Sequence, residues 1–300
     1  MGLLTDQVAI VTGAGGGIGR AIAETLAVEG AAVVANDYGV TVDGKEPSDS
    51  AGAAVAAAIE AAGGRACAHF GSIAEHAVAK ELVDLALDTY GRLDIVVTPH
   101  GILRERMIFN MSEQEWAEVI DVHLTGTFNI VRFASAHMRQ QRSGSMLLVS
   151  SNAGLEGSAG QANYAAAKLG IVGLTYATAL AMGKYDVNVN ALAPSADTRM
   201  TARLDNRFFG DRQTVSPMTV GAVAAALCSP AARHVTGQVY TAAGHRIARW
   251  THPVEDQVAF AQSDWTPADA LQTITGEFHN PPLARFARQG LASPATSAHV

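Results

Sequence analysis

Apolar residues fall into short runs that alternate with longer amphipathic or small-residue segments along most of the chain. The short runs are rich in Val, Ile, Ala and Leu and predict buried strands at 7–12, 31–36, 65–70, 93–97, 146–150, 188–191 and 237–241. The longer segments predict helices at 20–29, 51–62, 73–90, 112–126, 163–182 and 220–228. Because strands alternate with helices, the pattern predicts a parallel sheet covered on both faces. We expect an α/β, doubly wound, Rossmann-type domain over residues 1–250.

Polar residues mark where two of these helices should begin. Ser112 is followed by Glu115, and this S-x-x-E spacing is typical of a capping box. Ser72 is expected to cap the helix at 73–90, because its hydroxyl can accept a hydrogen bond from the first turn.

The chain changes character after residue 250. Its apolar periodicity weakens and prolines recur, so residues 251–300 predict a weakly folded C-terminal extension. Helix is expected there at most around 254–262 and 267–275.

A glycine-rich turn joins the first predicted strand to the first predicted helix. Thr12, Gly13, Gly17 and Gly19 fit the spacing T-G-x-x-x-G-x-G, whereas G-x-G-x-x-G fails in every register. Glycines let the backbone approach a pyrophosphate, whose charge the helix N-terminus favours. Asp37 ends the second strand, where a carboxylate accepts hydrogen bonds from ribose hydroxyls and repels an added phosphate. This pattern indicates NAD; the alternative is that Asp37 merely caps a turn.

A serine follows the fifth predicted strand directly, and a tyrosine and a lysine lie on the predicted helix after it. Tyr164 and Lys168 are four residues apart on a predicted helix, so both lie on one face. A nearby ammonium favours the phenolate and lowers the pKa of a tyrosine, which makes it a usable base. Ser151 is placed to hold the oxygen that gains or loses the proton. The alternative is a chance pair on a surface helix.

Composition and charge narrow the classes of partner. The chain has 300 residues and a formal net charge of −7 without a basic run, which argues against nucleic acid or an anionic membrane. Cys67 and Cys228 match no metal or redox spacing and are expected to be reduced thiols of a cytoplasmic protein. The histidines show no metal-type spacing, so no metal site is expected. The N-terminus lacks a signal-peptide pattern, and no apolar stretch reaches the ~18 residues of a membrane-spanning helix.

Together these motifs resemble the short-chain dehydrogenase/reductase family over residues 6–250. The resemblance implies that Tyr164 is the general base or acid, that Lys168 lowers its pKa and binds the nicotinamide ribose, and that Ser151 steadies the substrate oxygen. It also implies a homotetramer, with the small-residue helix at 165–182 in a subunit interface; the alternative is that this helix packs in the core of a monomer. The implied cofactor contacts are Gly13, Gly17, Ile18, Gly19, Asp37, Ser72, Ile73, Gly101, Tyr164, Lys168, Pro194 and Thr198.

Finer stretches resemble one branch of that family. VVANDYGV, GILRERM, DVHLTGTF, APSADTRMT and AAGHRIARW are similar to the (3R)-hydroxyacyl-CoA dehydrogenase part of peroxisomal multifunctional enzymes and to bacterial relatives. This implies a bulky lipid-like substrate, either a 3-hydroxyacyl-CoA or a hydroxysteroid, with residues 199–217 as a mobile lid. Two alternatives stay open: a dehydrogenase of a smaller alicyclic or terpenoid alcohol, and an NAD-binding subunit that has lost catalysis and supports an active partner.

The chain departs from the family pattern at three places. Thr98-Pro99-His100-Gly101 replaces Asn-Asn-Ala-Gly, Gly71 replaces an acidic residue, and His123 stands where the family has its catalytic asparagine. We expect a neutral His123 to serve in the proton relay, through its ring or its backbone carbonyl; the alternative is that the ring fills space. His100 is either a substrate contact or a polar loop residue. Arg199, Arg203 and Arg207 either meet coenzyme A phosphates or form a solvated helix face.

Overall fold

The computed structural model describes residues 2–196, 216–261, 264–279 and 283. They divide into two units, Met1–Trp250 and Thr251–Val300. The first contains the whole sheet and all the motifs discussed above except those that fall between residues 197 and 215.

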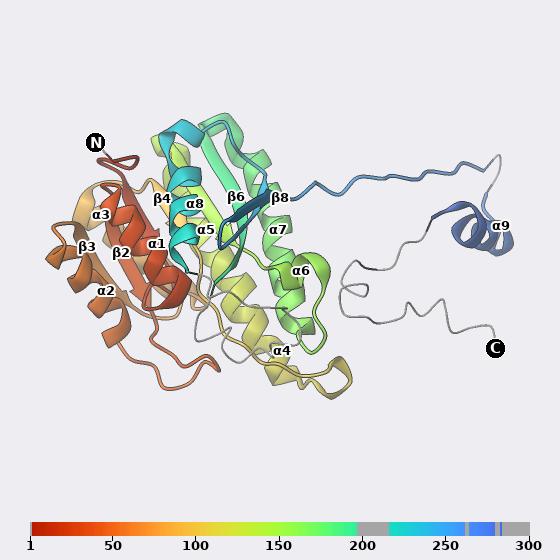
Figure 1. Ribbon diagram of the computed structural model, residues 1–300, viewed down its shortest axis with the longest axis horizontal. Coiled ribbons are helices and arrows are strands. Elements are labelled where there is room, and N and C mark those ends of the chain that lie inside the picture. The colour runs from red at the N-terminus through yellow and green to blue at the C-terminus, as the bar shows by residue number, and fades with distance from the viewer. Residues whose placement is uncertain (1, 197–215, 262–263, 280–282, 284–300) are drawn as a thin grey trace. The chain divides into compact units, whose positions relative to one another are not determined.

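A single eight-stranded sheet organises the first unit, with the order β3-β2-β1-β4-β5-β6-β7-β8 (Figure 1). Its strands are β1 Val8–Val11, β2 Ala32–Asp37, β3 Arg65–Phe70, β4 Ile95–Val97, β5 Gly144–Val149, β6 Val187–Ser195, β7 Val239–Ala243 and β8 Arg246–Arg249. All neighbouring strands from β3 to β7 pair in parallel, which confirms the predicted α/β, doubly wound class. The strand order reverses direction between β1 and β4, and such a switch point is where open α/β sheets bind ligands.

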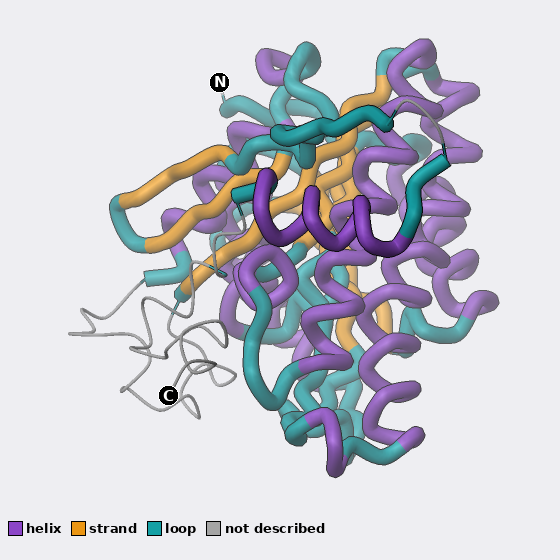
Figure 2. Tube along the Cα trace, turned by 90° about the vertical axis from the view of Figure 1, so that its right-hand side faces the viewer, coloured by secondary structure: helices purple, strands orange, loops and turns teal. Residues whose placement is uncertain are grey.

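The eighth strand was not predicted from the sequence. β8 pairs antiparallel with β7 through a hairpin at the sheet edge (Figure 2). Gly244 has φ +54° in the connecting turn, a conformation that suits glycine. The hydrophobic pattern gave no signal because the β8 residues Arg246, Ile247 and Arg249 are exposed.

Helices cover both faces of the sheet, as expected. They are α1 Gly17–Val28, α2 Ser50–Ala61, α3 His76–Tyr90, α4 Glu113–Ile120, α5 Gly126–Gln141, α6 Asn152–Glu156, α7 Ala162–Met182 and α8 Met218–Cys228. Strand side chains alternate between faces. Val11 and Val33 therefore join Leu26 of α1 in one core cluster, which also includes side chains of α2 and α8. Ile10 and Val34 point into the other cluster, with side chains of α3, α5 and α7.

The structure tests the two residues that were predicted to cap helices, Ser112 and Ser72. Ser112 and Glu115 form the complete capping box at α4, which confirms that prediction. Ser72 does not cap α3: this helix begins at His76, and the carbonyl of Ser72 accepts the N–H of Glu75 in a preceding turn. The prediction for Ser72 was therefore wrong.

The helix expected at 112–126 continues beyond its predicted end. A π-helical turn, Asp121–Thr125, follows α4 and leads directly into α5. π-helical turns are rare and are often found at functional sites. This one contains His123.

The longest helix passes a length and composition test for a membrane span, contrary to the expectation that no segment would. The stretch Ala162–Tyr185 has a mean hydropathy of 1.4 over its most apolar window, and 44% of that window is buried. Ile171, Thr175 and Ala179 of α7 are buried within the first unit. Its apolar character is thus that of a core helix, and one such segment is weak evidence for a membrane.

Among its described residues, the second unit contains the short helix α9. α9, Pro267–Gln272, is capped by Thr266, whose hydroxyl accepts the N–H of Asp269, and a π-helical turn, Thr273–Glu277, follows. Helix at 267–275 is therefore confirmed. Residues 254–261 are irregular, so the helix expected at 254–262 is wrong over its described part.

Candidate functional site

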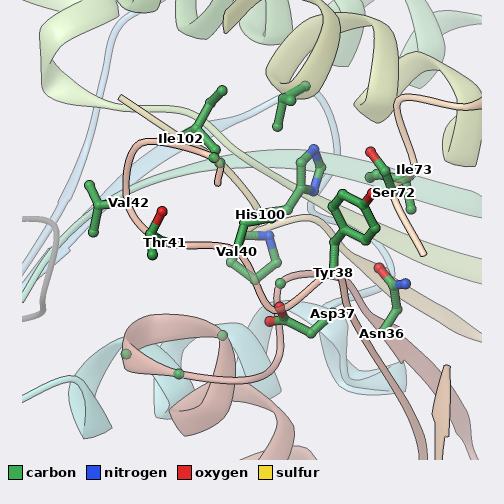
Figure 3. Close-up of a pocket in the computed structure, with 18 of the residues that line it drawn as sticks. Asn36, Asp37, Tyr38, Val40, Thr41, Val42, Ser72, Ile73, His100 and Ile102 are labelled. Atoms are coloured by element: carbon green, nitrogen blue, oxygen red, sulfur yellow. The ribbon is translucent and has the colours of Figure 1, made fainter. Parts of the chain in front are cut away.

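A cavity of about 460 Å³ opens at the carboxyl ends of the strands, where the strand order reverses. Its wall is built from the glycine turn after β1, the end of β2, and the loops after β3 and β4 (Figure 3). The predicted cofactor residues that line it are Gly13, Gly17, Ile18, Gly19, Asp37, Ser72, Ile73 and Gly101. Segments far apart in the sequence thus meet in one cavity.

Close packing explains the spacing of the glycine turn. Gly13 has φ +60°, and a Cβ there would lie 2.6 Å from Cα of His100. A Cβ at Gly19 would lie 2.0 Å from the carbonyl oxygen of Gly13. Gly16 is the N-cap of α1 and supplies no side chain, so backbone N–H groups form this end of the twelve-residue helix. Such a helix end attracts phosphate.

Asp37 lies directly against the glycine turn. Its Oδ2 accepts the N–H of Gly15 at 2.6 Å, and its Oδ1 accepts the N–H of Gly39 at 2.5 Å. The second bond closes a local turn, so the turn-capping interpretation of Asp37 is correct as far as it goes. The first bond places the carboxylate at the cavity, where Figure 3 shows it. Asp37 therefore both caps a turn and lines the cavity.

The loop after β4, which departs from the family pattern at residues 98–101, is hydrogen-bonded to the sheet through Thr98. The hydroxyl of Thr98 accepts the N–H of Val149 at 3.2 Å, and the N–H of Thr98 donates to Leu147 at 3.2 Å. Thr98 therefore joins β4 to β5 beyond their regular ladder. Pro99 follows and lines the cavity.

Ser151, Tyr164 and Lys168 come together beyond β5. Ser151 is the N-cap of α6, and its side chain accepts the N–H of Ala153 at 3.2 Å. Lys168 is 2% exposed, donates from Nζ to the carbonyl of Val149 at 2.7 Å, and lies 5.6 Å from the Tyr164 ring centroid. Burial lowers the pKa of Lys168 to about 7.

The pKa of Tyr164 differs from the sequence-based expectation. Burial raises it, and the opposing effect comes from a hydrogen bond with the Ser151 side chain. Lys168 does not produce the predicted lowering in the protein itself. The physical reason is that desolvation disfavours the charged phenolate.

His123 contacts both the cavity wall and the tyrosine. Its ring meets the Tyr164 ring edge to face, with centroids 5.0 Å apart and an interplanar angle of 90°. Nε2 lies 2.8 Å from the carbonyl oxygen of Ile102. Nδ1 is buried and has no hydrogen-bond partner among the described residues. Burial first, and then the charge of Lys168, hold the pKa of His123 well below its usual value, so the ring is neutral as expected.

One feature of the cavity had no signal in the sequence. Part of the loop between β2 and α2 is fastened across to the segment after β4: the N–H of Leu103 donates to the carbonyl of Val42 at 2.9 Å. Arg104 donates to the carbonyl of Asp43 and pairs with Glu118 at 2.7 Å. Figure 3 shows Val42 and Ile102 on facing parts of the wall. The bonds from Leu103 to Val42 and from Arg104 to Asp43 each join residues 61 positions apart, beyond the reach of local patterns.

Three predicted cofactor contacts, Tyr164, Lys168 and Pro194, are not among the residues that line this cavity. Pro194 lies in β6, paired with Ala242, and does not line the cavity. Thr198 lies outside the described residues, as do Arg199, Arg203 and Arg207 and nearly all of the expected lid.

Comparisons with known proteins identify relatives of the whole first unit. The family model for short chain dehydrogenases matches residues 7–207. Hydroxyacyl-CoA dehydrogenase ChsB1 of Mycobacterium tuberculosis is 41% identical over 288 residues, which are 92% of this chain and 89% of that protein. Peroxisomal multifunctional enzyme type 2 of Mus musculus is 44% identical over 195 residues, which are 65% of this chain and 26% of that enzyme. A crystal structure of a short chain dehydrogenase from Mycobacterium avium is 41% identical, with a TM-score of 0.82, covering 93% of this chain and 98% of that one.

Proposed function

Because the chain belongs to the short-chain dehydrogenase family, we propose that it transfers a hydride between NAD and a secondary alcohol or its ketone. The family resemblance found in the sequence is confirmed. The chain is a dehydrogenase that acts on CH–OH groups. The choice of NAD, the substrate and the catalytic residues are our proposal.

The cavity supports NAD as the cofactor. The glycine turn is packed too closely on the protein to carry side chains at Gly13 and Gly19, and the N-terminus of α1 at its end would face a pyrophosphate. Asp37 accepts two N–H groups, and a carboxylate has about four acceptor sites, so capacity remains for ribose hydroxyls. Its charge would repel the additional phosphate of NADP. When bound, NAD supplies the hydride acceptor.

The protein's own groups would then handle the proton. Ser151 would hold the alcohol oxygen, and Tyr164 would take the proton from it. Because burial raises the pKa of Tyr164, the phenol is favoured in the protein itself, and oxidation requires stabilisation of the phenolate by Ser151 and Lys168. Oxidation should therefore quicken as the pH rises, whereas reduction, which needs the phenol, should slow.

The substrate class is proposed from the relatives. ChsB1 is named a hydroxyacyl-CoA dehydrogenase, and the match covers most of both chains. We therefore assign this chain a bulky lipid-like substrate, a 3-hydroxyacyl-CoA or a hydroxysteroid, ahead of a small alicyclic or terpenoid alcohol. A cytoplasmic location fits the reduced thiols Cys67 and Cys228.

We also propose a homotetramer. Phe128 of α5 and Leu169 and Leu180 of α7 are large apolar side chains that the single chain leaves exposed. Contact with other copies would bury them, since apolar area removed from water contributes about 25 cal/mol per Å². Light scattering at micromolar concentration should give the mass of four chains, and the mass of one chain would contradict the proposal.

The observation that carries the proposed function is the meeting of Ser151, Tyr164 and Lys168, in which Lys168 is buried and Ser151 and Tyr164 are half-buried. The purified protein should produce NADH absorbance when mixed with NAD and 3-hydroxyacyl-CoA or hydroxysteroid substrates. Tyr164→Phe removes only the hydroxyl and should lower turnover by about 10² to 10⁴, the usual contribution of a general base. NAD binding should remain in this variant. No turnover by wild-type protein that binds NAD would instead support the non-catalytic subunit.

A further inference from the structure

A second histidine lies behind the cofactor cavity, and the reaction proposed above does not use it. His100 lines the cavity wall on the loop after β4 (Figure 3) and is 9% exposed. Its Nδ1 lies 2.6 Å from the hydroxyl oxygen of Thr12, and its Nε2 lies 3.5 Å from that of Thr127. The hydroxyl of Thr127 in turn donates to the carbonyl of His123 at 2.6 Å. Both threonines are fully buried.

The direction of each hydrogen bond follows from the number of protons. Thr127 has one hydroxyl hydrogen and donates it to the carbonyl of His123, so it can only accept from His100. The hydrogen of His100 is therefore on Nε2, which lies toward Thr127. A neutral imidazole has one N–H, so Nδ1 is an acceptor and Thr12 donates to it. Burial, followed by the charge of Lys168, lowers the pKa of His100 to about 3, which keeps the ring neutral.

This chain of bonds connects two segments of the site, the glycine turn and the π-helical turn. Thr12 is the first residue of the glycine turn, and a Cβ on the adjacent Gly13 would already overlap the backbone of His100. The other end holds the π-helical turn Asp121–Thr125, which carries His123 against Tyr164. A π-helical turn breaks the regular backbone bonding of a helix, so its carbonyls depend on partners such as Thr127.

We propose that His100 is a positioning residue, which fixes the π-helical turn to the glycine turn and thereby sets where His123 lies against Tyr164. The proposal rests on the dehydrogenase function. It assigns no chemical step to His100. Misplacement of a catalytic group by about 1 Å can cost about hundredfold in rate, so a residue with this role should act mainly on turnover.

The two ring nitrogens can be tested separately. In His100→Gln the side-chain amide can take the place of Nε2 and donate toward Thr127. In His100→Asn the shorter amide can take the place of Nδ1 and accept only from Thr12. His100→Ala provides neither the donor nor the acceptor. Thr127→Val removes the hydroxyl that accepts from His100 and donates to the carbonyl of His123. His245→Ala is the matched control, because its side chain is exposed.

Kinetics should separate these variants. His100→Ala, His100→Asn and Thr127→Val should each lose about tenfold to hundredfold in kcat, with the Kd of NAD by calorimetry within about threefold of wild type. His100→Gln should recover most of the rate, and His245→Ala should match wild type. Combining His100→Ala with Thr127→Val should cost little more than either change alone, because both break one chain of bonds.

A second measurement does not depend on activity. In protein labelled with ¹⁵N at histidine, long-range ¹H–¹⁵N spectra should show His100 as the neutral Nε2–H tautomer. The signals of His123 should shift in His100→Ala and Thr127→Val and stay near wild type in His100→Gln. If wild-type protein shows these signals but no turnover, the dehydrogenase proposal fails while the connection stands. An Nδ1–H tautomer, unmoved His123 signals in His100→Ala, or equal kcat in His100→Asn and His100→Gln would overturn the role of His100.

Discussion

The His123 ring packs directly against Gly101, where there is no room for a side chain. A Cβ at position 101 would lie 2.0 Å from Cε1 of the His123 ring and 2.9 Å from each ring nitrogen. The ring is 1% exposed and is held through Nε2 by the backbone of Ile102, so it has little freedom to retreat. The absence of a side chain at Gly101 therefore sets the place of His123 beside Tyr164.

Gly101→Ala should displace the His123 ring. We expect a loss of about 1–3 kcal/mol in the free energy of unfolding, the usual cost of overpacking, together with reduced turnover. Urea unfolding and steady-state kinetics measure the two effects. Gly183→Ala, just after α7, is the control, because a Cβ there meets nothing within 4 Å and its φ of −55° suits alanine. It should be neutral or stabilising by about 0.5–1 kcal/mol. An unchanged stability in Gly101→Ala would show that the ring moves freely.

Changes at His123 separate its ring from its backbone. His123→Asn should keep most of the activity, because an amide also offers one donor group and one acceptor. His123→Ala should slow turnover, by an amount within the 10²–10⁴ range of proton-transfer catalysis if the buried Nδ1 takes part. The pH–rate profile of oxidation should also change at its acid limb. If His123→Ala equals wild type in both rate and profile, only its backbone carbonyl can serve in the relay.

Asp37 should make the protein prefer NAD. We expect NADP to bind about tenfold to hundredfold more weakly, since an interaction with a charged group is worth about 1.5–3 kcal/mol. Calorimetry with both cofactors measures this. Asp37→Asn should narrow the difference, because it keeps a side-chain acceptor for the N–H of Gly15 and removes the negative charge. Equal affinities in the wild type would leave Asp37 with only its turn-capping role.

Acid should destabilise the protein through its buried histidines. The pKa of His100 is about 3 in the folded chain, below the value of about 6.5 in an unfolded one. The unfolded state therefore binds more protons between these values, and stability is lost as the pH falls from about 6.5 toward 3.

The size of this effect can be measured with one variant. His100→Gln does not titrate, so its loss of unfolding free energy between pH 6.5 and 5.5 should be smaller than that of wild type by about 1 kcal/mol. Urea unfolding at both values tests this. The exposed His245, replaced by Gln, should leave the wild-type difference unchanged. The same difference in all three proteins would show that His100 is protonated equally in both states.

Local patterns in the sequence predicted the order of strands and helices, the capping box at Ser112 and the glycine turn with Asp37. Each is a property of neighbouring residues: the periodicity of buried positions, one hydroxyl three residues from a glutamate, and glycines where a tight turn has no room for side chains. The spacing of Tyr164 and Lys168 also predicted that both lie on one face of a helix.

Only the tertiary structure decided how these groups behave. Lys168 donates to Val149, nineteen positions away, and burial raises the pKa of Tyr164 where charge alone predicted a fall. His100 meets Thr12 across eighty-eight positions, and β8 completes the sheet with exposed residues that carry no hydrophobic signal. Desolvation and long-range hydrogen bonds depend on what surrounds an atom in three dimensions. Residue spacing along the chain does not contain that information.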